Sequence, residues 1–119
     1  MNNSQTTAKT GEKLALGYLE NKGYSLVAKN VKYRGGEIDL IVRKSDKLIF
    51  VEVKTRTSQK FGYPEQSFDF RKKERVKAAI LRYIYESDYQ GDWRADLIAI
   101  ELSGKKALVR HYQSVELDD

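Results

Sequence analysis

Four charged residues on two neighbouring segments of the chain carry the clearest chemical pattern in this sequence. Glu37 and Asp39 lie in one segment, and Glu52 and Lys54 lie in the next. Carboxylate oxygens are the ligands that Mg²⁺ and Mn²⁺ prefer, and a lysine beside such a cation can stabilise the negative charge of a reacting phosphate. The pattern predicts metal-dependent hydrolysis of phosphodiester bonds, with Asp39, Glu52 and Lys54 as the catalytic residues.

A hairpin would bring the four side chains together. If the chain reverses in the middle of residues 44–47, paired residues have numbers that sum to 91. Asp39 then faces Glu52 and Glu37 faces Lys54, and the alternation of side chains along a strand places all four on one face. Two carboxylates in direct opposition destabilise a sheet. A divalent cation held between Asp39 and Glu52 would remove that repulsion.

The opposite face of the hairpin is expected to be buried, because it carries only apolar residues. These are Ile38, Leu40, Val42, Ile49, Val51 and Val53. The alternative interpretation is that the charged face is simply exposed to solvent, with Glu37 and Lys54 as a surface ion pair worth less than ~1 kcal/mol. Asp, Glu and Lys are poor strand formers, so four of them in two strands favour the functional interpretation.

The hydrophobic periodicity of the chain predicts the elements that must hold this hairpin. Helices are expected at 7–22, ended by Gly23, and at 69–86. The expected strands are a short one within 24–33 and four more at 37–43, 48–55, 94–102 and 107–112, with a loop at 57–67. This order predicts an α/β fold, in which a central mixed β-sheet is flanked by α-helices. A single domain is expected over 1–119, with flexible tails at 1–6 and 114–119.

The charge of the chain is concentrated in its middle. The net charge is +5 over 119 residues, but residues 54–82 carry nine basic and three acidic groups, and residues 83–119 carry four basic and eight acidic groups. A concentrated basic segment predicts a polyanionic partner such as nucleic acid. The alternative interpretation is a helix face that is charged only to remain solvated.

Composition excludes several kinds of site. The chain has no cysteine and one histidine, so a disulfide scaffold, a thiolate zinc site and a cluster of imidazoles are ruled out. The first seven residues are polar, no secretory signal follows them, and no segment approaches the ~20 apolar residues that span a bilayer. These observations predict a cytoplasmic protein with no membrane partner.

Two segments resemble a known family. The residues GEIDLI at 36–41 and FVEVKTR at 50–56 are similar to those of the YraN-type family of small bacterial predicted endonucleases. Their D…ExK pattern is that of the restriction-endonuclease-like nucleases, and it is similar to that of archaeal Holliday junction resolvases. Weaker matches include Gly11 and Glu12, Pro64, and residues 95–100, so the resemblance covers about residues 9–112.

The resemblance implies a restriction-endonuclease-like core in which Asp39 and Glu52 bind Mg²⁺ or Mn²⁺ and Lys54 is catalytic. It adds Glu12 as a candidate metal ligand, for which the alternative is an exposed glutamate favoured by the helix dipole. The backbone carbonyl of Val53 is a further candidate ligand. Two residues are candidates for supporting roles, Glu37 and Gln66.

Nucleic acid is expected to bind through its phosphates, because no base-reading motif is present. The candidate contacts are Arg56, Lys60, Arg71, Lys72 and Arg75. By analogy with the superfamily, the expected activity is that of an endonuclease on DNA, including branched or flapped forms, and a homodimer is a further expectation. The alternatives are a catalytically silent nucleic-acid-binding module of the same fold and a protein-interaction adaptor that uses the acidic segment 83–119.

Overall fold

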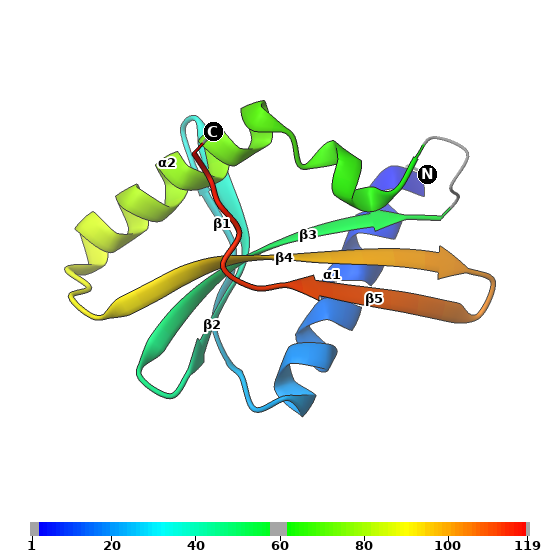
Figure 1. Ribbon diagram of the computed structural model, residues 1–119, viewed down its shortest axis with the longest axis horizontal. Helices are drawn as coiled ribbons and strands as arrows, with labels where there is room; N and C mark the ends of the chain where they lie inside the picture. Colours follow the sequence, from blue (N-terminus) through cyan, green and yellow to red (C-terminus); the bar gives the residue numbers. More distant parts are fainter. Residues whose placement is uncertain (1–2, 58–61, 119) are drawn as a thin grey trace.

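Five strands and two α-helices make up most of the described chain, residues 3–57 and 62–118, in a computed structural model (Figure 1). In chain order the elements are α1 (Asn3–Asn21), β1 (Ser25–Tyr33), β2 (Gly36–Lys44), β3 (Lys47–Arg56), the 3-10 helix η2 (Pro64–Ser67), α2 (Phe70–Ser87), β4 (Asp92–Ser103) and β5 (Lys106–Tyr112). The predicted helices and strands are therefore all present. The loop expected at 57–67 differs, because it contains η2, whose first residue Pro64 has the fixed φ that suits a helix start.

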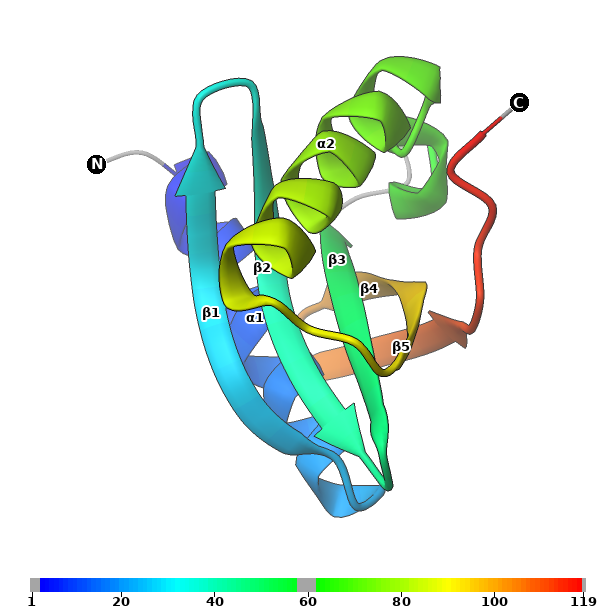
Figure 2. The same cartoon turned by 90° about the vertical axis from the view of Figure 1, so that its left-hand side faces the viewer.

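The sheet is mixed, as predicted. Its strands lie in the order β1-β2-β3-β4-β5, and only the β3–β4 pair is parallel. The parallel pair requires a crossover, which is supplied by the connection that contains η2 and α2. α2 crosses one face of the sheet and α1 covers the other (Figure 2). This α/β arrangement is compatible with a restriction-endonuclease-like core.

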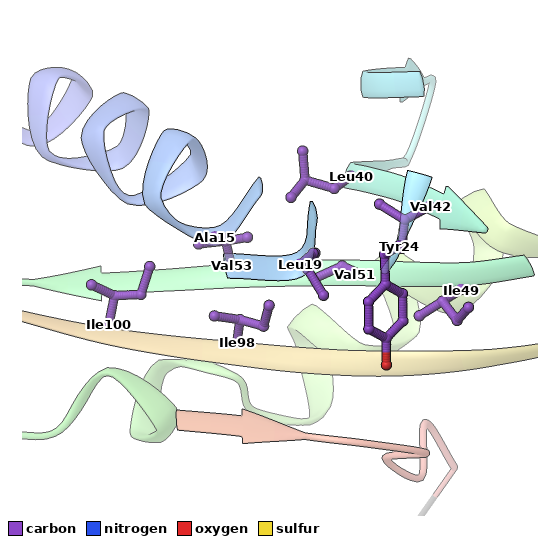
Figure 3. Packing of buried hydrophobic residues seen from close by; sticks show 10 residues of the cluster. All are labelled: Ala15, Leu19, Tyr24, Leu40, Val42, Ile49, Val51, Val53, Ile98 and Ile100. Atoms are coloured by element: carbon purple, nitrogen blue, oxygen red, sulfur yellow. The ribbon is translucent and has the colours of Figure 1, made fainter. Parts of the chain in front are cut away.

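The face covered by α1 is packed with aliphatic side chains. Ala15 and Leu19 of α1 are fully buried against Leu40, Val51 and Ile98 of the three central strands (Figure 3). Burial of side chains of this size stabilises a fold by about 1.5–3 kcal/mol each, so this layer fixes α1 on the sheet. The hydrophobic spacing that predicted the helix is therefore the spacing of its buried stripe.

The face covered by α2 has a second buried cluster. Val76, Ala79 and Ile80 form the apolar stripe of α2, and they pack with Ile41 and Phe50 of the sheet. The Asp69 side chain begins the helix by accepting a hydrogen bond from the backbone N–H of Lys72 at 3.1 Å. The hydrophobic periodicity that predicted this helix is thus that of the residues that contact the sheet.

The first helix starts earlier than expected. α1 begins at Asn3 rather than at residue 7, because helical hydrogen bonds continue through polar residues that carry no hydrophobic signal. Near the other end, the backbone N–H of Ser114 donates to the Asp96 carboxylate at 3.0 Å, and the N–H of Val115 donates to the carbonyl of Ala95 at 2.8 Å. These contacts hold the C-terminal segment against β4.

The single histidine is part of a buried polar network. His111 lies between the Asp96 carboxylate, 2.7 Å away, and the hydroxyl of Tyr18, 3.2 Å away. Arg94 also donates to Asp96, at 2.9 Å. Burial raises the pKa of Asp96, but the hydrogen bonds from His111, Arg94 and Ser114 outweigh it and hold that pKa below its usual value. The network links α1, β4 and β5.

No helix in the described part of the chain has the length and apolar character required to cross a lipid bilayer.

Candidate metal and nucleic-acid site

The site lies where β2 and β3 separate. The predicted register is confirmed from Lys44↔Lys47 to Leu40↔Val51, but the pairing ends there. Beyond that point β2 stays paired with β1 and β3 stays paired with β4, so the two strands are drawn apart. The expected ladder pairs of Asp39 with Glu52 and of Glu37 with Lys54 are therefore wrong. They are replaced by a hydrogen bond from the backbone N–H of Val53 to Asp39 Oδ2, at 2.8 Å.

β2 also departs from strict alternation at this point. Ile38 was expected to share a face with Leu40 and Val42, but it packs on the α2 side with Ile41, three residues later. The expected face for Ile38 is therefore wrong. The cause is an irregularity at Asp39, whose side chain takes over a hydrogen bond that a regular strand would make through its backbone.

β1 has a matching irregularity. Asn30 has a left-handed backbone, with a φ of 53°, and it lies opposite Asp39, between the pairs Lys29↔Leu40 and Val31↔Ile38. Asparagine tolerates this conformation better than most residues. Each of the two neighbouring strands is therefore distorted at the same level of the sheet, next to the predicted metal ligand.

A cleft of about 600 Å³ opens at this level, and five elements supply its polar side chains. They are Gln5, Lys9 and Glu12 from α1, Asn30 and Lys32 from β1, Glu37 and Asp39 from β2, Glu52 and Lys54 from β3, and Lys72 and Arg75 from α2. The cleft therefore brings together the predicted catalytic residues, the candidate metal ligand Glu12 and the candidate supporting residue Glu37.

Glu52 is the most perturbed group of the cleft. Its side chain is only 7% exposed, and its Oε2 atom lies 3.3 Å from Lys54 Nζ. Within the described residues its Oε1 atom is buried and has no hydrogen-bond partner. Burial and, after it, the neighbouring Asp39 carboxylate raise the pKa of Glu52 to about 9, although Lys54 opposes the shift.

Glu12 lies close to the same carboxylates. Partial burial raises its pKa, as do the charges of Asp39 and Glu37, whereas a hydrogen bond from the Asn30 side chain and the charge of Lys29 lower it. No three Asp, Glu or His side chains of the described residues form a ready-made metal cluster. Glu12 is therefore a neighbour of the Asp39–Glu52 pair rather than part of a preformed triad.

The donor set suits a hard divalent cation. Asp39 and Glu52 offer adjacent carboxylates, and one buried oxygen of Glu52 has its hydrogen-bonding capacity unused among the described residues. Val53 lines the same cleft. Mg²⁺ is usually held in proteins by one or two carboxylates, with water and phosphate oxygens as its other ligands. The residues present therefore fit such an ion.

The predicted basic and supporting residues separate into three groups. Lys72 and Arg75, in the first two turns of α2, line the cleft. Arg56 and Arg71 do not line it, and Lys60 lies outside the described residues. Gln66 is not brought to the cleft either, because its side-chain oxygen accepts a hydrogen bond from the backbone N–H of Tyr63 at 2.7 Å. That contact is internal to the start of η2.

Sequence reasoning missed four polar residues of the cleft, Gln5, Lys9, Asn30 and Lys32. Lys9 precedes Glu12 by three residues, which places both on one side of α1. Lys32 pairs with Glu37 across β1 and β2, so a predicted β1–β2 register would have found it. Nothing in the sequence reveals the left-handed backbone of Asn30.

Comparison with known proteins gives a consistent family. The family described as "Uncharacterised protein family UPF0102" matches residues 11–100. A UPF0102 protein of Caldanaerobacter subterraneus subsp. tengcongensis is 42% identical over 105 residues, which cover 87% of this chain and 86% of the relative. One from Carboxydothermus hydrogenoformans is 38% identical over 114 residues, 95% of this chain and 97% of the relative. This chain therefore belongs to the UPF0102 family.

Proposed function

We propose that this protein is a metal-dependent endonuclease that hydrolyses phosphodiester bonds in nucleic acid, with DNA as the polymer. The observation that carries the proposal is the buried Glu52 Oε1 atom, which has no hydrogen-bond partner among the described residues and lies in a cleft beside the Asp39 carboxylate. A buried carboxylate oxygen without a hydrogen-bond partner destabilises the folded state, and a cation that binds this oxygen would offset the destabilisation.

Each residue of the cleft has a role in this proposal. Asp39 and Glu52 would hold Mg²⁺ or Mn²⁺, with Glu12 and the Val53 carbonyl as further donors. When bound, the cation supplies Lewis-acid polarisation of the phosphate and lowers the pKa of a coordinated water. The hydrogen bond from the Val53 N–H fixes the Asp39 carboxylate, so its orientation is set before any ligand arrives.

Lys54 supplies the positive charge nearest the two carboxylates. Its Nζ atom is 3.3 Å from Glu52, and its side chain is 17% exposed, so it can reach a phosphate that enters the cleft. There it would stabilise the charge that develops on the phosphate oxygens during the displacement. Lys72 and Arg75 of α2 would bind neighbouring phosphates of the same backbone.

A second candidate function is a catalytically silent nucleic-acid-binding module with the same cleft. The observation that favours it is the lack, in the described part of the chain, of a preformed cluster of three acidic or imidazole ligands. In that case the basic residues of the cleft would bind the backbone, and the carboxylates would not support turnover.

Cleavage assays separate the two functions. Wild type, Asp39→Asn and Lys54→Ala would be incubated with linear, flapped and four-way DNA and with single-stranded RNA, in Mg²⁺, Mn²⁺ or EDTA. We expect metal-dependent cleavage by wild type and a loss of about 100-fold or more in both variants. Lys47→Ala, at the other end of β3, is the matched control and should cleave as wild type does.

Two outcomes would overturn the proposal. Equal cleavage by wild type and both variants would show that a contaminating nuclease is responsible. Binding of DNA by wild type without cleavage of any substrate would favour the silent module.

A further inference from the structure

The cleft has basic residues on its β1 side that the proposed function does not use. Lys9 of α1 and Lys29 and Lys32 of β1 are all exposed. Lys9 and Lys32 line the cleft, and Lys29 directly precedes Asn30, which also lines it. In the described part of the chain none of the three forms an ion pair, so their charges are available to a ligand.

The left-handed backbone of Asn30 explains why Lys29 and Lys32 lie on the same face of the sheet. In a regular strand, residues three apart point to opposite faces. Here Ala28 and Val31 both pack against the α2-side cluster, although they are three residues apart. The left-handed Asn30 lies between them and shifts the alternation. Lys29 and Lys32, which follow Ala28 and Val31 directly, therefore both project to the face that α1 covers.

This arrangement places cations on both sides of the carboxylates. Lys72 and Arg75 approach the cleft from α2, on one face of the sheet. Lys9 approaches from α1, and Lys29 and Lys32 approach from β1. β1 is the edge strand of the sheet, next to β2 (Figure 2). Asp39 and Glu52 lie between the two groups. Basic residues that served only to balance the local acidic charge would not need to lie on both sides of the carboxylates.

We propose that Lys9, Lys29 and Lys32, here called the β1 wall, bind the phosphodiester backbone on the side of the metal site opposite Lys72 and Arg75. The proposal rests on the proposed function and deepens it. It defines the ligand as an internal segment of polynucleotide, with phosphates bound on both sides of the scissile bond. A free strand end is not required for such binding, because neither group of cations has to recognise a terminus.

The test measures binding without turnover. Fluorescence anisotropy would follow a fluorescein-labelled DNA duplex and its single strand in EDTA, over a range of salt concentrations. For the variant Lys29→Ala/Lys32→Ala, we expect affinity for the duplex to fall about tenfold or more. The slope of log K against log salt should become shallower by about 1.8, because each lost phosphate contact removes about 0.9. Lys72→Ala/Arg75→Ala should behave similarly.

A matched control removes the same charge elsewhere. Lys44→Ala/Lys47→Ala changes two lysines that face each other across the β2–β3 turn, at the opposite end of the sheet. This variant should keep the wild-type salt slope. If Lys29→Ala/Lys32→Ala also keeps the wild-type salt slope while Lys72→Ala/Arg75→Ala weakens binding, the proposal that the β1 wall binds DNA is wrong and the proposed function stands. If wild type neither binds nucleic acid in EDTA nor cleaves it in Mg²⁺ or Mn²⁺, the proposed function fails and the proposal for the β1 wall fails with it.

Variants of Asn30 test the structural cause separately from charge. Asn30→Gly loses the side chain that reaches Glu12 but keeps access to a left-handed backbone, so it should bind DNA more tightly than Asn30→Val. Asn30→Val disfavours that backbone and should weaken binding and flatten the salt slope, although every lysine remains. Circular dichroism would show that both variants are folded. Equal binding by the two folded variants would overturn the role of Asn30.

Discussion

Glu52 illustrates the conflict between stability and function in this molecule. A carboxylate that is 7% exposed, beside a second carboxylate, is expensive to ionise, and one of its oxygens has no hydrogen-bond partner in the described chain. Lys54 offsets only part of this cost, because it contacts the other oxygen. A fold selected for stability alone would place a neutral side chain here.

Replacement of Glu52 by Gln should therefore stabilise the metal-free protein. The amide has the same shape, is neutral and can donate a hydrogen bond to Asp39, so we expect a gain of about 1–3 kcal/mol in the free energy of unfolding. Urea unfolding in EDTA at neutral pH measures it. Glu37→Gln, at an exposed position of the same cleft, is the control and should change stability by less than about 0.5 kcal/mol. A destabilised Glu52→Gln variant would contradict the account of the buried charge.

The spacing of residues predicted much of the site but not its detailed geometry. Asp39, Glu52 and Lys54 were found because strand alternation is regular over most of β2 and β3. The Asp39–Val53 hydrogen bond was not predictable, since it depends on the point at which β1 and β4 draw the two strands apart. The left-handed backbone of Asn30 was not predictable either, because tertiary contacts select it.

The helices are held close to the sheet by glycines beside the site. A Cβ atom at Gly11 of α1 would lie 1.8 Å from Thr55 Oγ1 of β3, and one at Gly36 of β2 would lie 2.2 Å from the backbone carbonyl oxygen of Arg75 in α2. Gly11 precedes Glu12 and Gly36 precedes Glu37. These two contacts therefore set how closely both helices approach the cleft.

Alanine substitutions in α1 should have opposite effects at its two glycines. Gly11→Ala forces α1 away from β3 and should destabilise the protein by about 1–3 kcal/mol. Gly17→Ala has open space around the new methyl group and should stabilise the helix by about 0.5–1 kcal/mol. Thermal unfolding of both variants, followed by circular dichroism, makes the comparison. Equal effects would show that the close contact of α1 with β3 is not important for stability.

The attachment of η2 to the sheet is expected to depend on pH. Arg110 of β5 donates hydrogen bonds to Glu65 of η2, one of them at 2.8 Å, and this lowers the pKa of Glu65 from 4.5 to about 2. A carboxyl whose pKa is lower in the folded state stabilises that state above its unfolded pKa. The contribution is therefore complete above pH 4.5 and disappears as the pH falls towards 2.

Glu65→Gln tests that pH dependence. At pH 7 we expect the variant to be less stable than wild type by about 1–2 kcal/mol, a value discounted because the pair is partly exposed. The difference should shrink as the pH is lowered from about 4.5 to about 2. Urea titrations at several pH values measure both chains, and a difference that stays constant down to pH 2 would exclude the ion pair as its source.

The order of elements was predictable because each one buries a periodic apolar stripe. The stripe of α2 and the alternation of β2 and β3 identify their type and their buried faces. The start of α1 and the helix η2 were less predictable, since polar residues such as Gln5 and short segments such as 64–67 carry no periodic signal. The position of η2 is decided by contacts with elements distant in sequence, such as that of Glu65 with Arg110.

The charge of the whole chain understates its capacity to bind anions. The net charge of +5 includes Glu12, Glu37, Asp39 and Glu52, which are gathered in one cleft together with five basic side chains. A divalent cation in the cleft would reverse the local repulsion of phosphate. The distribution of charge therefore favours a function in which the cleft holds a metal ion. It gives less support to the adaptor function, which uses the acidic segment 83–119 and requires no metal.

Metal binding should accordingly stabilise the entire fold, because the cleft is built from both helices and three strands. We expect Mn²⁺ to raise the melting temperature of wild type, with a gain of about 2.7 kcal/mol at a free metal concentration of 100 times the Kd. Asp39→Asn and Glu52→Gln should lose this response, whereas Asp46→Asn, at the β2–β3 turn, should keep it. Thermal melts with Mn²⁺, Mg²⁺ and EDTA provide the comparison. A response that persists in both cleft variants would place the metal elsewhere, and no response in wild type would favour the adaptor.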